Sequence, residues 1–486
     1  MTDDRPASAS VPRVSRGTKY LYAVGRISEG VKGRAFEFFL FFYYVQVLGL
    51  SGSLAGLAVG VALLFDAITD PLAGSVSDGM TGRLGRRHPM MYASILPLGL
   101  FFYLLFVPPD GLGQYALFGW LCVFSVLTRT AMTLFQVPYL SLGAELTSNY
   151  TERTGIVAIR SVFGALGSVG ALLLGLNLFL APTPEFPNGQ LNGAAYPPFA
   201  LAMSLIMMLT VLICARGTQH LVPHLPQASG GQGRIGLSRM FRELREAMGN
   251  GAFRSLFIGM MFLYIVLGTH AALSLHMSTY YWELSQAQIS SFVVSGGIGY
   301  LAGLMVARRF HVRFDKKRAF VVGLAALGIF GAIGPGLREI SLFPANDSML
   351  LLPTLQLLVF LTAFAGAVAG VSGGSMMADV ADSHELSSGR RQEGIFFGAA
   401  AFAGKAASAF GHMIAGFAID IIGFPRHVEP GTVAPEMLTE LGLFYGPIMA
   451  IGMVVGIVYF LRYDLDQHRH AEILATLAAR RKAAGE

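Results

Sequence analysis

Charged residues and cysteine are scarce in this sequence. Of its 486 residues only 13% are Asp, Glu, Lys or Arg, whereas soluble globular domains contain about 25%. The two cysteines, Cys122 and Cys214, both fall in apolar stretches, which argues against a disulfide framework or a cysteine metal site. The polar first 19 residues are not followed by a short apolar segment with a cleavage site, so we expect no removable signal peptide.

Apolar runs fill most of the chain. Hydrophobic residues make up 53% of it and the mean hydropathy is positive. Runs near the roughly 20 residues that cross a bilayer recur throughout, among them "MYASILPLGLFFYLLFV", "FALAMSLIMMLTVLIC" and "LLLPTLQLLVFLTAFAGAVAGV". We count twelve and predict an all-α, multi-pass membrane protein of twelve transmembrane helices.

The net charge of +6 reflects membrane orientation rather than nucleic-acid binding. Lys and Arg gather in alternate loops, as in "RLGRR" and "RRFHVRFDKKR", while the intervening "APTPEFPNGQLNGAAYPP" has none. Because cytoplasmic loops are enriched in Lys and Arg, we expect both termini to be cytoplasmic, in a cell inner membrane.

A polar stretch divides the predicted spans six and six. We expect a cytoplasmic tail over 1–19, a six-helix bundle over 20–216, a linker with a short amphipathic helix over 217–250, a second bundle over 251–464 and a tail over 465–486. Similar basic loops follow the second and eighth spans. Two matched halves predict a substrate site in a central cavity near the membrane midplane.

The first span carries an unusual number of charges. Arg26, Glu29, Lys32, Arg34 and Glu37 all precede its apolar end near "YYVQVLGL". Charges inside the membrane are costly and face the bundle interior, where Glu29 and Lys32, at i and i+3, can pair. Substrate binding and an internal salt-bridge network both remain open for this cluster.

Two aspartates interrupt the second span in "FDAITDPLAG". Asp66 and Asp70 lie four residues apart on one helix face. Two such carboxylates repel unless a proton or a cation lies between them, which suits a cation-coupled transporter. Lys405, in "AFAGKAASAFGHMIAG", lies in the middle of span eleven, where its charge would balance the acidic pair; a helix-packing site is the alternative.

Several of these motifs together resemble a known family. Three stretches are similar to the glycoside-pentoside-hexuronide:cation symporters: "FYYVQVLGLSGSLAGLAVGVALLFDAITDPLAGSVSDGMTGRLGRRHPM", "TLFQVPYLSLGAELTSNYTERT" and "MMADVADSHELSSGRRQEGIFFGAAAFAGKAASAF". This family includes the melibiose and glucuronide permeases and the sodium-dependent lysophosphatidylcholine symporter. The resemblance implies the major facilitator fold, with two six-helix bundles around a central cavity.

The resemblance also implies residue roles. It implies a monovalent-cation site for sodium or a proton at Asp66, Asp70 and Thr133, and substrate contacts at Arg160 and Lys405. Gln136, Glu29 and Lys32 are our further substrate candidates. The resemblance also implies a gating latch in each half. In the first half it is formed by Asp78, Arg83, Arg86 and Arg87, with ordinary topogenic charge as the alternative. In the second half it is formed by Asp379, Asp382, Glu385, Arg390, Arg391 and Glu393, with ordinary surface charge as the alternative.

Departures from the melibiose permease bear on the substrate. Gly30 and Gln136 stand where that permease has sugar-binding aspartates, and Leu140 replaces a nearby tryptophan. This argues against simple galactosides, and Lys32 with Arg34 favours an anionic or zwitterionic substrate.

These observations predict secondary active symport. We expect import of a small glycoside, uronide or related solute by a monomer, without a cofactor. A lysophospholipid or other amphiphile as substrate, and a membrane sensor that does not transport, are the alternatives. We find no nucleophile with a base and no phosphate-binding loop, and predict no enzyme.

Overall fold

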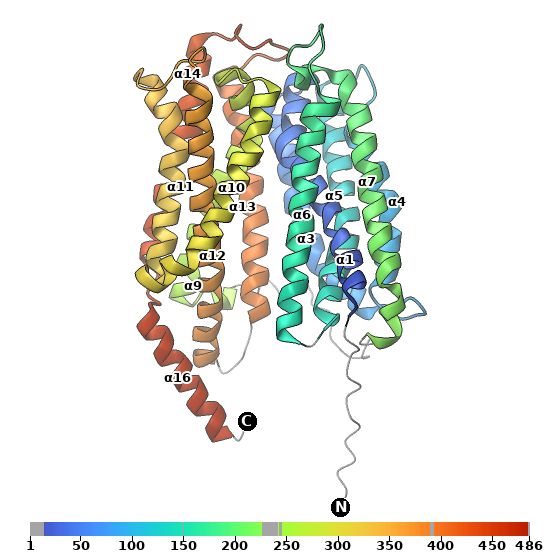
Figure 1. The fold of residues 1–486 in the computed structure, drawn as a ribbon, viewed down its shortest axis with the longest axis vertical. Coiled ribbons are helices and arrows are strands. Elements are labelled where there is room, and N and C mark those ends of the chain that lie inside the picture. The colour runs from blue at the N-terminus through green and yellow to red at the C-terminus, as the bar shows by residue number, and fades with distance from the viewer. Residues whose placement is uncertain (1–13, 148, 226–241, 243–244, 389–392, 485–486) are drawn as a thin grey trace, which may run out of the picture.

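The computed structural model describes residues 14–147, 149–225, 242, 245–388 and 393–484, and all of their regular structure is helical. Long helices stand side by side in two halves, blue to green for the first and yellow to red for the second (Figure 1). Both termini lie at the same end of this bundle, which we call the terminal end; the opposite end is the far end. The predicted all-α fold is confirmed.

The first half is built from one interrupted helical segment and five long helices. The segment runs from residue 16 to residue 47 as α1 (Arg16–Val24), α2 (Arg26–Arg34), and the π-helical turns η1 (Ala35–Leu40) and η2 (Tyr43–Val47). The helices are α3 (Gly52–Gly79), α4 (His88–Leu105), α5 (Gln114–Glu145), α6 (Tyr150–Leu174), extended by η3 (Gly175–Phe179), and α7 (Tyr196–Thr218). The 3₁₀ turns are η4 (Gly189–Leu191), η5 (Gly193–Ala195) and η6 (Gln219–His224).

The second half has the same general plan. Its helices are α9 (Gly251–His276), extended by η7 (Met277–Tyr281), α10 (Gln286–Phe314), α11 (Lys316–Glu339), α12 (Leu351–Ser388), α13 (Glu393–Ile422), α14 (Pro435–Leu443), η8 (Phe444–Ile448) and α15 (Met449–Leu461). A further helix, α16 (Gln467–Ala484), occupies the predicted C-terminal tail and packs against α12. Most of the predicted linker helix lies outside the described residues.

Eleven helices of the described chain are long and apolar enough to cross a membrane. The segment 16–47 is not among them, although it is long enough, because it carries four charged residues in α2 and one in η1. Length and composition therefore support eleven of the twelve predicted spans. The first segment is helical as well, but it contains more charged residues than those eleven helices.

The two halves are packed together at the far end. One apolar core runs through the first half and continues into α9, η7 and α13 of the second half, while a second core lies within the second half toward the terminal end. Helix α3 packs closely against α13 because glycines remove side chains from the contact. A Cβ atom added at Gly52 would lie 2.6 Å from the Gly416 carbonyl oxygen, and one at Gly56 would overlap the backbone of α13.

Polar contacts close the same far end. Asp420 of α13 accepts hydrogen bonds from the backbone N–H groups of Gly52 and Ser53, each at 2.8 Å, and so caps the N-terminus of α3 from the other half. Arg426 donates to the Gly49 carbonyl at 3.1 Å, and Tyr280 donates to the Gln46 side chain at 3.1 Å.

Candidate functional site

Asp66, Asp70 and Thr133 meet at the contact between α3 and α5. The two aspartates lie one turn apart on α3, and the Thr133 hydroxyl of α5 lies 3.0 Å from Asp66 Oδ1 and 2.8 Å from Asp70 Oδ1. A hydroxyl carries one hydrogen and donates to one carboxylate at a time. The three residues that the resemblance assigns to a cation site therefore form one cluster of oxygen atoms.

Lys405 reaches this cluster from the second half of the molecule. Its Nζ lies 2.9 Å from Asp66 Oδ2 and 2.5 Å from Asp70 Oδ2. Because the ammonium carries a single positive charge, it does for the two carboxylates what a bound monovalent cation would do: it separates them and offsets part of their repulsion. The contact also joins α13 to α3, on the terminal-end side of the glycine-rich packing between these two helices.

Sequence reasoning missed a second cation that contacts this cluster. Arg129 of α5 is buried, its Nη1 lies 3.4 Å from Asp66 Oδ2, and its guanidinium lies over the Phe36 ring at 4.7 Å from the centroid. The signal was in the sequence, since "VLTRTAMT" places an arginine inside a long apolar run, where ionisable residues are rare.

The predicted pair between Glu29 and Lys32 is wrong. Glu29 pairs instead with Arg26 at 3.3 Å, and Arg34 pairs with Glu37 at 3.8 Å. Positions i−3 and i+3 are both within reach of position i, but they lie about 120° apart around the helix, and Glu29 lies on the more exposed side with Arg26. Lys32 is turned into the bundle, where it interacts electrostatically with Asp66.

The other two substrate candidates lie closer to the terminal end. Gln136 is one turn beyond Thr133 on α5 and is half-buried. Arg160 of α6 interacts with the Tyr22 hydroxyl, which in turn donates to the Tyr139 carbonyl at 3.1 Å. Both residues belong to the first half, Gln136 on the helix that carries Thr133 and Arg160 on α6.

The first predicted latch is a compact ion-pair network at the terminal end. Arg87 contacts Asp78 and Glu145, each at 2.6 Å, and Arg86 contacts Glu145 at 2.8 Å, while Arg83 is exposed. All of these residues belong to the first half. The network therefore joins α3, the following loop and α5 to one another.

The second predicted latch also lies within one half. Asp379 pairs with Lys316 at 2.8 Å, and His470 of α16 lies 3.1 Å from Asp382. Glu385 lies further along α12. Arg390 and Arg391 fall outside the described residues, and Glu393 is the first residue of α13. Where both partners are described, the ion pairs at the terminal end join residues of the same half.

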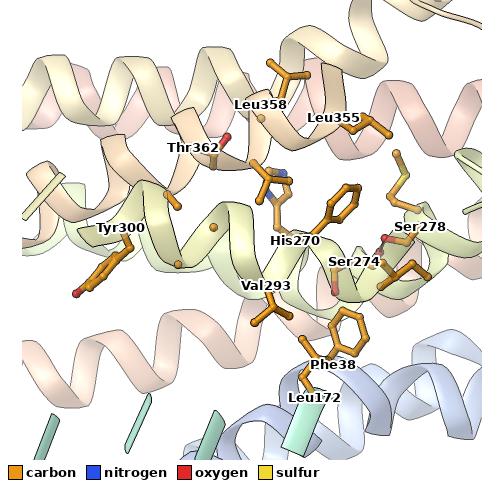
Figure 2. Close-up of a pocket in the computed structure, with 18 of the residues that line it drawn as sticks. Phe38, Leu172, His270, Ser274, Ser278, Val293, Tyr300, Leu355, Leu358 and Thr362 are labelled. Carbon is orange, nitrogen blue, oxygen red and sulfur yellow. Dashed lines mark hydrogen bonds between the residues drawn. The ribbon is translucent and has the colours of Figure 1, made fainter. Parts of the chain in front are cut away.

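A second feature is a largely apolar cavity of about 700 Å³ between the halves. Phe38 and Leu172 border it from the first half, and His270, Val293 and Leu358 from the second (Figure 2). Arg34 is the one Lys, Arg, Asp or Glu residue among its described lining residues.

Comparison with known proteins identifies the family. The family model described as "MFS/sugar transport protein" matches residues 21–467. The chain belongs to this family. It is 24% identical to the putative glycoside/cation symporter YagG of Escherichia coli, over 96% of this chain and 95% of that protein. It is also 24% identical to the sodium-dependent lysophosphatidylcholine symporter 1-A of Danio rerio, over 93% and 86% respectively.

Solved structures share the fold. The nucleoside transporter NupG superposes with a TM-score of 0.61 at 15% identity, covering 92% of this chain and 99% of that one. The xylose transporter XylE from E. coli, in an inward-open conformation, gives 0.56 at 14% identity, covering 95% and 98%. These structures confirm the predicted fold. The family match and the symporter relatives show a major facilitator transporter of the cation-symporter type, which confirms the predicted class of function.

Proposed function

We propose that this symporter imports a small glycoside, uronide or related solute together with sodium or a proton, and that Asp66 and Asp70 bind the coupling cation. The observation that carries the proposal is the position of Lys405, whose amine lies between the two carboxylates. A pair that already holds one tethered cation has the oxygen atoms and the charge to hold a free one. The bundle transports its substrate unchanged, so no catalytic residue is assigned.

The coupling cation competes with Lys405 in this scheme. A cation that binds to Asp66, Asp70 and Thr133 releases the Lys405 amine and so loosens the contact between α3 and α13 near the midplane. Substrate binds beside the cation site. Gln136 and Arg160 are its primary contacts, and Glu29 and Lys32 are its secondary contacts. If the cation raises the affinity for substrate, the substrate raises the affinity for the cation by the same factor.

The terminal end is assigned to the cytoplasm of an inner membrane. Basic residues gather in its loops, in agreement with the positive-inside rule. Since the halves are tied together at the far end, through Asp420 and the α3–α13 packing, this conformation is assigned as inward-facing. The two latch networks are proposed to reorganise and bridge the halves when the carrier faces outward. A monomer is sufficient for this mechanism.

Thermal stabilisation of the purified protein tests the proposal. The ligands are sugars, uronides and lysolipids, each with and without sodium at pH 6 and pH 8. We expect one class to raise the melting temperature more in the presence of sodium, or at the lower pH, and Asp66→Asn to abolish that enhancement. A ligand whose effect is independent of both ions would contradict symport.

An amphiphile is the second candidate substrate. The apolar cavity between the halves supports it, because about 700 Å³ of mainly apolar space suits an acyl chain and exceeds the needs of a monosaccharide. Competition distinguishes the candidates. Lysolipid that displaces a bound sugar, or that alone shows cation-dependent binding, favours the amphiphile, whereas competition among sugars or uronides without effect of lysolipid favours the solute.

A further inference from the structure

The carboxylate cluster is surrounded by more positive than negative charge. Asp66 and Asp70 supply two carboxylates, and three buried or half-buried cations approach them: Lys405 at 2.5 to 2.9 Å, Arg129 at 3.4 Å, and Lys32 within electrostatic range of Asp66. Glu29 and Glu37 also act on Lys32 and Arg129 at longer range, but each is paired with a further cation, Arg26 or Arg34, so the wider group holds five cations and four carboxylates. A coupling cation adds a further positive charge to this group. In a low-dielectric interior such an excess is costly unless an anion joins it.

Lys32 makes no hydrogen bond or ion pair with another described residue, and the carboxylates of Asp66 and Glu29 act on its charge only at longer range. It is only 8% exposed, and its expected partner Glu29 is engaged by Arg26. An ammonium group carries three donors, and an isolated buried charge costs several kcal/mol. The side chain is therefore placed to bind an acceptor that the protein itself does not supply.

Arg129 is only partly satisfied as well. It is 7% exposed, and its Nε is buried without an acceptor among the described residues. Its contact with Asp66 Oδ2 is long, and Lys405 lies closer to the same oxygen. The aromatic ring of Phe36 covers one face of the guanidinium and leaves its edge for in-plane hydrogen bonds, the geometry that suits a carboxylate or phosphate.

The two groups interact with each other as well as with Asp66. Lys32 on α2 and Arg129 on α5 are within electrostatic range, so their charges repel while the site is empty. An anionic group between them removes this repulsion and provides both with acceptors. Asp70 and Lys405 are 37% and 31% exposed, whereas Lys32 and Arg129 are 8% and 7% exposed, so solvent reaches this group of charges mainly at Asp70 and Lys405.

We propose that Lys32 and Arg129 form a binding subsite for a single anionic group of the substrate, a carboxylate or a phosphate, next to the coupling-cation site. This inference rests on the proposed function and narrows its substrate class. It also gives coupling a physical cause, because the substrate anion offsets the charge of the incoming cation. A sugar acid and a lysophospholipid headgroup share this chemistry.

Direct binding measurements with matched probes test the subsite. Methyl β-glucuronide is compared with methyl β-glucoside, and lysophosphatidylglycerol with monoacylglycerol of the same chain, on the full-length protein in nanodiscs with sodium at pH 6 and pH 8. We expect one anionic probe to bind at least about tenfold more tightly than its neutral partner. The pair that shows this preference identifies the source of the anion.

Variants assign the preference to the two residues. Lys32→Gln and Arg129→Gln are each expected to reduce the preference for the anionic probe over its neutral partner about tenfold, since each removes one charge-assisted contact. Arg129→Lys retains the charge and should recover part of the preference. Lys317→Gln should leave the preference unchanged, because Lys317 is a half-buried lysine of α11 whose amine donates to the Leu461 carbonyl. Melting temperatures confirm that each variant is folded.

The outcomes separate this inference from symport itself. Equal binding of anionic and neutral probes, binding of neither anionic probe, or equal loss of both classes in the two variants would overturn the subsite. Cation-dependent stabilisation that disappears in Asp66→Asn would still support symport in those cases. An anion preference that is lost in Lys32→Gln but does not depend on sodium or pH would support the subsite and contradict symport.

Discussion

Replacing Asp420 by asparagine is expected to open the far end of the transporter. The carboxylate accepts two backbone hydrogen bonds from the first turn of α3, each at 2.8 Å. Asparagine keeps one acceptor and turns its NH₂ group toward the second backbone donor. Loss of a hydrogen bond to a charged group costs about 1.5–3 kcal/mol, and loss of negative charge at a helix N-terminus about 0.3–1 kcal/mol.

The side chain of Asp420 is 28% exposed, so solvent reduces these values and we take a total of about 2 kcal/mol. Since every 1.4 kcal/mol is a factor of ten, the equilibrium between closed and open far ends shifts about 30-fold toward the open state. Most of the terminal-end contacts are unaffected, because they lie within each half. The variant should therefore fold normally and change its conformational distribution.

Distances between spin labels measure this shift. Asp110 and Asp347 are exposed in far-end loops of the first and second halves, and both are replaced by cysteine in a Cys122→Ser background. Asp420→Asn should add a longer distance to the distribution. Asp464→Asn is the control, because Asp464 pairs only with Arg469 of its own half in the described chain. Identical distributions in the two variants would refute the role of this cap.

Two further substitutions test the packing and the tethered amine. Gly56→Ala should lose most substrate uptake, because an added Cβ would overlap the backbone of α13. Gly74→Ala on the same helix is the control and should retain uptake, since its Cβ would lie 3.6 Å from its nearest neighbour. Similar uptake by the two variants would contradict the packing argument. Lys405→Met should bind the coupling cation at least about tenfold more tightly in a thermal-shift titration, and weaker binding would contradict competition by Lys405.

The carboxylate cluster was predictable because its parts obey simple rules. Two acidic residues at i and i+4 must share a helix face, and a buried lysine requires an anion, so Asp66, Asp70 and Lys405 could be singled out from the sequence. Their meeting through Thr133 came from the family resemblance. Arg129 could have been found by the same reasoning about charges in apolar runs.

Other contacts could not be predicted for physical reasons. Glu29 has a cation on either side at a spacing of three residues, and the choice of Arg26 over Lys32 depends on which face is turned inward by tertiary packing. The cap formed by Asp420 on α3 joins residues more than 360 positions apart, and it depends on how the two halves are tilted. The apolar pattern determines the helices but leaves that tilt open.

Cation-driven accumulation in proteoliposomes tests the central claim most directly. The ligand identified by thermal stabilisation is offered to wild type, Asp70→Asn and the control Asp464→Asn, each under an inward sodium or proton gradient. The account predicts accumulation by wild type and the control, and only equilibration or no uptake by Asp70→Asn, although that variant still binds the ligand. Accumulation by Asp70→Asn to the wild-type level would contradict the assignment of the coupling cation to the aspartate pair.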